Sequence, residues 1–305
     1  DDVEFQNLGL VIVDEQHRFG VAQRLALKNK GRDVHQLMMS ATPIPRTLAM
    51  SFFADLDVSV IDELPPGRTP IKTRLVNNVR RAEVEGFVLN ICRKGQQAYW
   101  VCPLIEESET LQLQTATETL AQLQAALPEL NIGLVHGRMK AAEKAEVMAQ
   151  FAAGHLNVLV ATTVIEVGVD VPNAALMVIE HAERMGLAQL HQLRGRVGRG
   201  AAESVCVLLF AEPLSELAKA RLKVIYEHTD GFEIAHQDLN IRGPGEFLGA
   251  RQSGVPMLRF ANLEEDLHLL EQAREIAPML IEQNPEIVEA HLARWLSSRE
   301  GYLGV

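Results

Sequence analysis

The sequence predicts an α/β fold in which a largely parallel β-sheet is covered by helices. Short runs of valine, isoleucine and leucine alternate with longer segments of helical spacing, a pattern typical of β-α-β units. Several of these runs end directly in polar residues or glycine, as expected at the carboxyl edge of a parallel sheet, where ligands bind. At 305 residues the chain is long enough for two domains.

The composition is that of an ordinary globular protein, with 47% hydrophobic and 23% charged residues. No apolar run approaches the roughly 18 residues that a membrane-spanning helix needs. Three widely spaced cysteines (Cys92, Cys102 and Cys206) form neither a disulfide framework nor a zinc pattern, so we expect the reducing cytoplasm as the location. A net charge of −11 argues against a surface that binds nucleic acid everywhere, but not against a local basic groove.

The first predicted strand, residues 8–13, is a continuous apolar run and should be buried on both faces of a parallel sheet. It ends in Asp14 and Glu15. One of these carboxylates could hold Mg²⁺, usually through water, while the other orients or deprotonates an attacking water. The alternative is a surface turn that the two acids cap. The apolar strand directly before them favours a chemical role.

A second short strand, residues 35–39, leads into Ser40 and Thr42, and Pro43 and Pro45 then end the extended run. Their hydroxyl groups could link a nucleotide site to a moving surface. The pattern by itself favours the simpler interpretation, in which they cap the helix predicted to follow.

Residues 62–70 contain three prolines and a glycine, which indicates a stiff linker and a domain boundary. A regular alternation follows, and after residue 212 the pattern becomes helical, interrupted by a glycine-rich loop at 240–254. We predict strands at 71–76, 97–101, 132–135, 157–161, 175–179 and 204–210, and helices at 81–93, 109–126, 141–153, 187–194, 214–227, 230–239, 263–281 and 285–296.

Two of these strand ends carry candidate phosphate-binding residues. Gly137 and Arg138 follow the strand at 132–135 and open a helix, where the helix N-terminus favours an anion such as a nucleic-acid phosphate. The neighbouring His136 is most simply a loop histidine with satisfied hydrogen bonds. Thr162 and Thr163 follow another buried strand, and their hydroxyl groups and amides could hold a phosphodiester.

Farther along the second of these loops, Asp170 could accept a hydrogen bond from a sugar hydroxyl, or it could simply be a cap before Pro172.

The segment 192–199 (Gln-Leu-Arg-Gly-Arg-Val-Gly-Arg) concentrates three arginines between glycines, directly after a predicted helix. Guanidinium groups are always charged and match phosphate oxygens with a planar set of donors. Such a cluster could stabilise a phosphoryl group in transit, as an arginine finger does. A solvated basic turn or a nucleic-acid patch remains the alternative at this point.

Four segments, in this order along the chain, resemble conserved motifs of superfamily 2 helicases: residues 14–20 motif II, 39–48 motif III, 162–170 motif V and 192–199 motif VI. Residues 60–68 and 238–254 resemble more closely the RecG family of bacterial ATP-dependent DNA branch-migration helicases. The chain is also similar to the transcription-repair coupling translocases, although the linker at 62–68 favours RecG.

The resemblance implies two RecA-like lobes with ATP between them. It divides the chain into a lobe 1 remnant at 1–65, a parallel-sheet lobe 2 at 66–212 and an α-helical extension at 213–305 with a translocation loop at 238–254. Branched DNA, together with the wedge domain and lobe 1 of the same parent chain, would be the partners.

The resemblance also implies roles for individual residues. Asp14 would serve Mg²⁺ through water, Glu15 would position the attacking water, and Arg196 and Arg199 would be the arginine fingers. The remaining implied roles are nucleotide contact for Gly168, Asp170 and Gln192, coupling for His17, Ser40 and Thr42, and DNA binding or translocation for Gly137, Arg138, Thr162, Thr163, Arg242, Arg251 and Gln252.

One departure limits what we expect of the isolated chain. The phosphate loop Gly-x-x-x-x-Gly-Lys-Ser/Thr, which the family carries before motif II, is absent from these residues. We therefore expect weak ATP and Mg²⁺ binding and no hydrolysis by the chain alone, and we expect residues 1–60 to be mobile or abnormally docked. Alternatives of other classes are a superfamily 2 RNA unwinder and a module that only binds protein or DNA.

Overall fold

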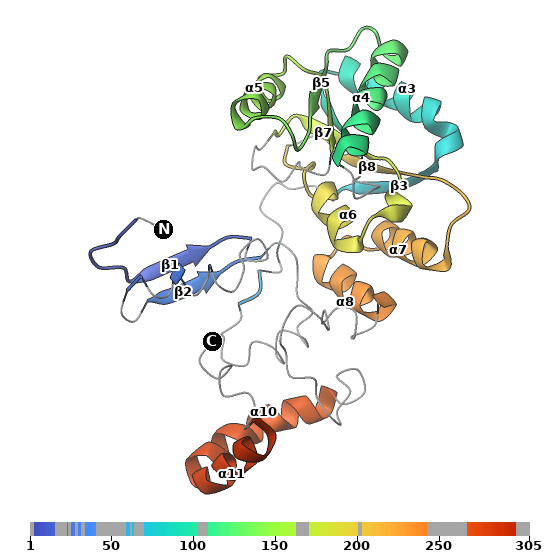
Figure 1. The fold of residues 1–305 in the computed structure, drawn as a ribbon. Helices are drawn as coiled ribbons and strands as arrows, with labels where there is room; N and C mark the ends of the chain where they lie inside the picture. The colour runs from blue at the N-terminus through green and yellow to red at the C-terminus, as the bar shows by residue number, and fades with distance from the viewer. Residues whose placement is uncertain are drawn as a thin grey trace. The chain divides into compact units, whose positions relative to one another are not determined.

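The computed structural model describes most of the chain, and it divides into two compact units (Figure 1). One unit comprises residues 57–243, and the other comprises residues 1–56 and 244–305. Each is described by itself. The described residues are 3–15, 23, 26–27, 30–31, 34–40, 59–61, 63, 70–102, 109–162, 171–200, 203–242 and 267–296.

The larger unit is built on a six-stranded parallel sheet with the strand order β3-β8-β7-β4-β6-β5. All six strands lie where the apolar runs predict them, because runs of this kind suit strands that are buried on both faces. Their bounds are β3 (Lys72–Asn77), β4 (Gln97–Cys102), β5 (Ile132–Val135), β6 (Val158–Thr162), β7 (Ala174–Ile179) and β8 (Val205–Phe210).

Helices cover both faces of this sheet. On one face lie α3 (Arg81–Arg93) and α4 (Glu109–Ala126). The opposite face is covered by α5 (Ala141–Ala152), α6 (Leu187–Arg194), α7 (Glu216–Glu227) and α8 (Gly231–Arg242). Two 3₁₀ turns complete the unit, η2 (Asn78–Arg80) before α3 and η3 (Ala182–Arg184) before α6.

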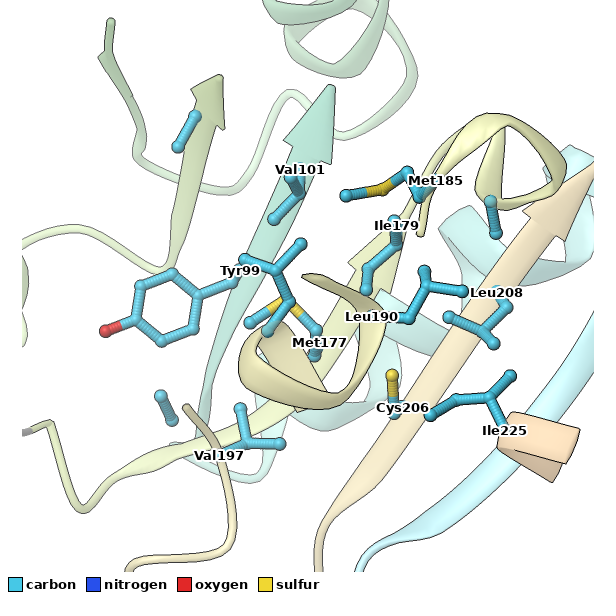
Figure 2. Close-up of a cluster of buried hydrophobic side chains, with 14 of the residues drawn as sticks. Tyr99, Val101, Met177, Ile179, Met185, Leu190, Val197, Cys206, Leu208 and Ile225 are labelled. Atoms are coloured by element: carbon cyan, nitrogen blue, oxygen red, sulfur yellow. The ribbon is translucent and has the colours of Figure 1, made fainter. Parts of the chain in front are cut away.

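Two hydrophobic cores form because successive side chains of a strand point to opposite faces. In the central strand β4, every residue is buried. Trp100 packs beneath α3 and α4, whereas Tyr99 and Val101 belong to the other core together with Leu190 of α6 (Figure 2). The position of α6 follows from its sequence, since Leu187, Leu190 and Leu193 recur at helical spacing and are all buried.

The smaller unit contains a two-stranded parallel sheet of β1 (Leu10–Val13) and β2 (His35–Met38) within its described residues. The predicted burial of the first strand on both faces is wrong: Leu10 and Ile12 are 54% and 57% exposed, and Leu37 beside them is 49% exposed. These three side chains share one face of the sheet, and the described residues do not cover it.

The same unit also holds α10 (Leu267–Gln283) and α11 (Pro285–Leu296), which pack against each other. Of the boundaries that we predict, the one after residue 212 can be set beside the packing: α7 and α8, which follow it, contact the sheet unit through α6. The three-part division itself stays a prediction. Within the described residues, no helix is long and apolar enough to cross a membrane.

Candidate functional site

The carboxyl edge of the large sheet brings together two of the predicted phosphate-binding segments. Strands β5 and β6 are neighbours, and their pairing runs to Val135 opposite Ala161. His136 therefore lies beside Thr162, with Gly137 and Arg138 directly after it. This is the edge where ligands of open α/β sheets bind. Thr163, the other threonine of this pair, lies outside the described residues.

Buried polar atoms without partners mark this edge. The Thr162 hydroxyl and the Nδ1 atom of His136 are buried, and neither has a hydrogen-bond partner. The interpretation of His136 as a loop histidine with satisfied hydrogen bonds is therefore wrong. Burial, and then the charges of Lys144 and Arg138, lower the pKa of His136 below its ordinary value, so the neutral ring is favoured here. An unsatisfied buried group of this kind is suited to a ligand or an ordered water.

The predicted finger arginines lie at the end of α6, away from the carboxyl edge. Arg196 is half-buried and Arg199 is exposed, so neither is enclosed in the domain core. Within the described residues no hydrogen bond or ion pair occupies the Arg196 guanidinium, which leaves its donors available to an anion. Gln192 lies half-buried one helical turn earlier, on the face of α6 that does not carry the core leucines.

Two glycines shape the backbone between and after these arginines. Gly198 has φ +82°, a left-handed conformation that side-chain-bearing residues adopt only with strain, so it sets the direction in which Arg199 leaves the helix. Gly195 has an ordinary helical φ of −68° and has no such need. At Gly200 an added Cβ would lie 2.3 Å from the Pro172 carbonyl oxygen. The loop that precedes β7 and the arginine segment are thus in close backbone contact.

We predict that Gly200→Ala destabilises the larger unit by about 1–3 kcal/mol, because the new methyl group forces backbone away from backbone. Urea unfolding followed by the fluorescence of Trp100, in a Trp295→Phe background with a single tryptophan, measures the change. Gly86→Ala is the matched control. Gly86 lies within α3 with open space around its Cβ position, so alanine should raise stability by up to ~1 kcal/mol. An unchanged midpoint for Gly200→Ala would contradict the packing described above.

Arg194, the first arginine of the cluster, is a structural residue that the sequence argument did not separate from its neighbours. It is only 3% exposed. Its guanidinium donates hydrogen bonds to the carbonyl oxygens of Ile225 (2.8 Å) and His228 (2.9 Å), at the C-terminal end of α7. The available signal is its spacing, since Arg194 follows Leu187 by seven residues and so shares the buried face.

The two acidic residues of the predicted magnesium site follow β1, as expected. Asp14 is exposed, and its Oδ1 accepts a hydrogen bond of 2.8 Å from the backbone N–H of Glu15. Glu15 has φ +49°, a left-handed conformation that is rare outside glycine. Strained backbone of this kind persists where the surroundings hold it, and it is frequent at functional sites.

The other predicted site residues are described only in part. Ser40 follows β2 and is exposed, and Arg242 is the last residue of α8. The structure leaves undescribed His17, Thr42, Thr163, Gly168, Asp170, Arg251 and Gln252. Their assigned roles remain predictions.

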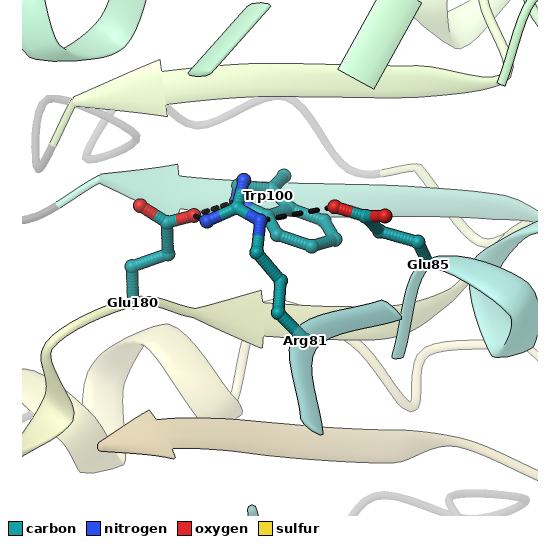
Figure 3. A network of polar contacts seen from close by, with 4 residues as sticks. All are labelled: Arg81, Glu85, Trp100 and Glu180. Carbon is teal, nitrogen blue, oxygen red and sulfur yellow. Dashed lines mark hydrogen bonds and ion pairs between the residues drawn. The ribbon is translucent and has the colours of Figure 1, made fainter. Parts of the chain in front are cut away.

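The structure adds a buried polar cluster that the sequence analysis did not identify (Figure 3). Glu180, directly after β7, accepts hydrogen bonds from Arg81 of α3 and from the indole N–H of Trp100. Arg81 also donates to Glu85 at 3.0 Å, and its guanidinium lies 5.0 Å from the Trp100 ring centroid. Apart from an acid placed directly after a strand, the sequence contains no signal for this cluster.

Comparison with protein-family models gives two matches. Residues 83–201 match the helicase conserved C-terminal domain. Residues 228–296 match the C-terminal part of domain 3 of the ATP-dependent DNA helicase RecG. The first match contains the β-α units and the arginine segment, and the second contains α8, α10 and α11.

Among curated proteins, the chain is 59% identical over 302 residues to ATP-dependent DNA helicase RecG of Acidithiobacillus ferridurans. It is 57% identical over 307 residues to RecG of Escherichia coli strain K12. Each alignment covers 99% of this chain and 44% of the relative, so the chain spans less than half the length of these proteins.

Among solved structures, RecG bound to a three-way DNA junction shares 50% identity with a TM-score of 0.68, covering 88% of this chain and 34% of that one. Saccharomyces cerevisiae Dbp5 bound to RNA and ADP BeF3 has 15% identity, a TM-score of 0.51 and coverage of 89% and 64%, a likeness that concerns the fold alone. The large parallel sheet is thus a RecA-like helicase lobe.

Proposed function

The chain belongs to the RecG family and corresponds to the C-terminal part of its relatives, and we propose that it forms the C-terminal motor portion of an ATP-dependent DNA helicase that remodels branched DNA. The observation that carries this proposal is the state of Arg196: its guanidinium is held at the end of α6 by a buried helix and is not occupied by a partner within the described residues. The identity to RecG proteins supports the same assignment.

The donor set of the site fits a magnesium-bound nucleotide. The Asp14 carboxylate suits Mg²⁺, which prefers oxygen ligands and retains several waters. When bound, ATP and Mg²⁺ supply the phosphoryl group to be transferred and the charge that offsets its oxygens. Glu15 orients the attacking water, and Arg196 and Arg199 donate to the developing negative charge, with Gln192, Gly168 and Asp170 at the nucleotide.

For DNA we propose the carboxyl edge of the sheet, where Thr162, Gly137 and Arg138 are close together. Hydroxyl groups, backbone amides and an arginine bind phosphates without reading sequence, as a helicase that moves along DNA requires. The acidic net charge of −11 confines this binding to the local edge. The RecG structure on a three-way junction supports branched DNA as the substrate.

The remaining assignments depend on the family or on composition. His17, Ser40 and Thr42 couple nucleotide to DNA, and Thr163 joins Thr162 at the phosphate. Arg242, Arg251 and Gln252 belong to the loop that converts lobe closure into DNA movement. The described cysteines are free and buried, as suits a protein of the reducing cytoplasm.

A chimera tests the proposal, in which this chain replaces the matching C-terminal region of the Escherichia coli relative. We expect ATP hydrolysis that branched DNA stimulates more than single-stranded DNA or RNA does, with a steep loss of DNA binding as salt rises. The chain by itself should show no steady turnover. Stimulation by RNA instead would indicate an RNA unwinder, and stimulation only with RNA polymerase would indicate a transcription-repair translocase. A chimera without hydrolysis would reduce the chain to a binding module.

A further inference from the structure

We propose that Glu180 is a positioning residue for Arg196 and Arg199, held in place by Arg81 and Trp100. The inference rests on the proposed function, because it assumes that these two arginines act on the transferred phosphoryl group. Glu180 touches no predicted ligand. It acts through the segment that it begins, which leads from β7 through η3 into α6.

The contacts of Glu180 come from three elements. Its backbone N–H donates to the Val101 carbonyl oxygen at 2.9 Å, which ties it to β4. Its carboxylate oxygen Oε1 accepts from Trp100 Nε1 at 2.9 Å and from Arg81 Nη1 of α3 (Figure 3). The Glu180 side chain is only 6% exposed, and that of Arg81 is 22% exposed. Charged hydrogen bonds in so enclosed a place are strong and directional.

The chain crosses from one face of the sheet to the other directly after this anchor. Glu180 and Trp100 lie on the α3 side, whereas Ala182 and Met185 are buried in the core on the α6 side. His181 between them has φ +48° and ψ +41°, a left-handed conformation for a residue that bears a side chain. A backbone of this kind persists only when contacts on both sides hold it. Glu180 supplies the contact on the α3 side.

A second acid fixes the far side of the crossing. Glu183 Oε2 accepts from the backbone N–H of Ala211, just after β8, at 3.3 Å. Three residues of 3₁₀ turn and a short connection then lead to Leu187, where α6 begins. With eight residues in α6, little chain separates the Glu180 anchor from Arg196. A shift at the anchor is therefore passed to the arginines through short, packed segments.

The ion pair is better explained by orientation than by stability. Buried ion pairs contribute little net stability, because desolvation offsets their attraction, and apolar residues often replace them without loss. What such a pair supplies is a defined geometry. Arg81 has two acceptors, Glu180 and Glu85, and stacks over Trp100, so the direction of the Glu180 carboxylate is fixed from several sides.

The test substitutes Glu180→Gln in the chimera with the Escherichia coli relative. Glutamine keeps the volume and an acceptor for Trp100, but it removes the charge that faces Arg81. We expect kcat for ATP to fall about 10-fold at saturating branched DNA, with KM for ATP unchanged, since small misplacements of positioned groups lower rates by up to about 10²-fold. In an Arg196→Ala background the same substitution should change kcat by less than about twofold, because residues that act as a unit are not additive.

Glu129→Gln is the matched control. It breaks the exposed pair between Glu129 and Arg93, at the other end of α3, and should leave kcat unchanged. The fluorescence of Trp100, as the single tryptophan, should shift with Glu180→Gln and not with Glu129→Gln. Should Glu180→Gln fail to fold, Arg81→Lys, which keeps the charge but loses the planar fork, is measured in the same way.

The outcomes separate this inference from the proposed function. If Arg196→Ala lowers kcat and Glu180→Gln does not, the positioning role is overturned and the motor assignment stands. Equal losses from Glu180→Gln with and without Arg196 also overturn it, because Glu180 would then act by another route. If Arg196→Ala itself leaves kcat unchanged, the proposed function fails.

Discussion

Replacing Arg196 with alanine in the chimera is expected to lower kcat for ATP about 10³-fold or more, the range that an arginine finger contributes to phosphoryl transfer. The physical reason is that charge spreads over the phosphoryl oxygens in the transition state, and a fixed guanidinium stabilises it without reorganisation. Arg196 is prepared for this task, since Val197 next to it is fully buried and Gly198 turns the chain, while its own guanidinium is not occupied within the described residues.

The KM for ATP should change far less than kcat, because this contact strengthens in the transition state and not on binding. Arg196→Lys should recover only part of the rate, since an ammonium group lacks the planar pair of donors. Added guanidinium ion should partly restore the alanine variant and have no such effect on the lysine variant. Arg93→Ala, at an exposed ion pair of α3, serves as the control. An Arg196→Ala chimera that hydrolyses ATP at the normal rate would contradict the finger role.

The regular elements could be predicted because each carries a strong local signal. The helix bounds at Leu187–Arg194 and Pro285–Leu296 agree with the sequence prediction. In α6 the signal is the leucine spacing, and in α11 it is the proline at the first helical position, where its missing N–H is harmless. Strand β5 was predictable because a short apolar run ends at a polar residue and glycine, His136-Gly137.

The burial of β1 could not be read from its residues alone. An apolar run predicts which side chains avoid water, but the elements that cover them are set by tertiary structure. Leu10 and Ile12 remain exposed on a face that the described residues leave uncovered. The apolar pattern thus specifies the strand, its pairing with β2 and its polar end at Asp14, and leaves its surroundings open.

The roles within the arginine cluster also needed the structure. In the sequence, Arg194, Arg196 and Arg199 look alike. Their separation depends on where α6 ends and on the left-handed turn at Gly198, which together direct Arg194 inward and leave Arg199 exposed. Glu180 was missed for a related reason, since its partner Arg81 lies 99 residues earlier in the chain. No local pattern reports a contact over that separation.

Arg194→Met is the second substitution for which we expect a large effect, in this case a loss of about 3–5 kcal/mol in the stability of the larger unit. Arg194 is buried, and burial lowers its pKa from the ordinary value, yet guanidinium groups remain charged in proteins. Its acceptors are carbonyl oxygens, the Thr73 hydroxyl and an imidazole nitrogen, with no carboxylate among them.

The charge is instead offset by the C-terminal end of α7. Helix C-termini carry partial negative charge and free carbonyl groups, and the carbonyl oxygens of Ile225, His228 and Thr229 all accept from Arg194, at 2.8, 2.9 and 3.3 Å. Methionine fills similar space but leaves these buried acceptors without a donor, at roughly 1–3 kcal/mol for each that water cannot reach. Arg194→Lys should recover part of the loss.

Urea unfolding, followed by Trp100 fluorescence in the Trp295→Phe background, measures the effect. Arg93→Met is the control and should change stability by less than about 1 kcal/mol, because its pair with Glu129 is exposed. Amide exchange in α7 and the start of α8 should accelerate before exchange in β4 does, because the lost hydrogen bonds are at their junction. If Arg194→Met unfolds at the same urea concentration as Arg93→Met, Arg194 does not hold α6 to α7. Its place in the cluster would then need another explanation.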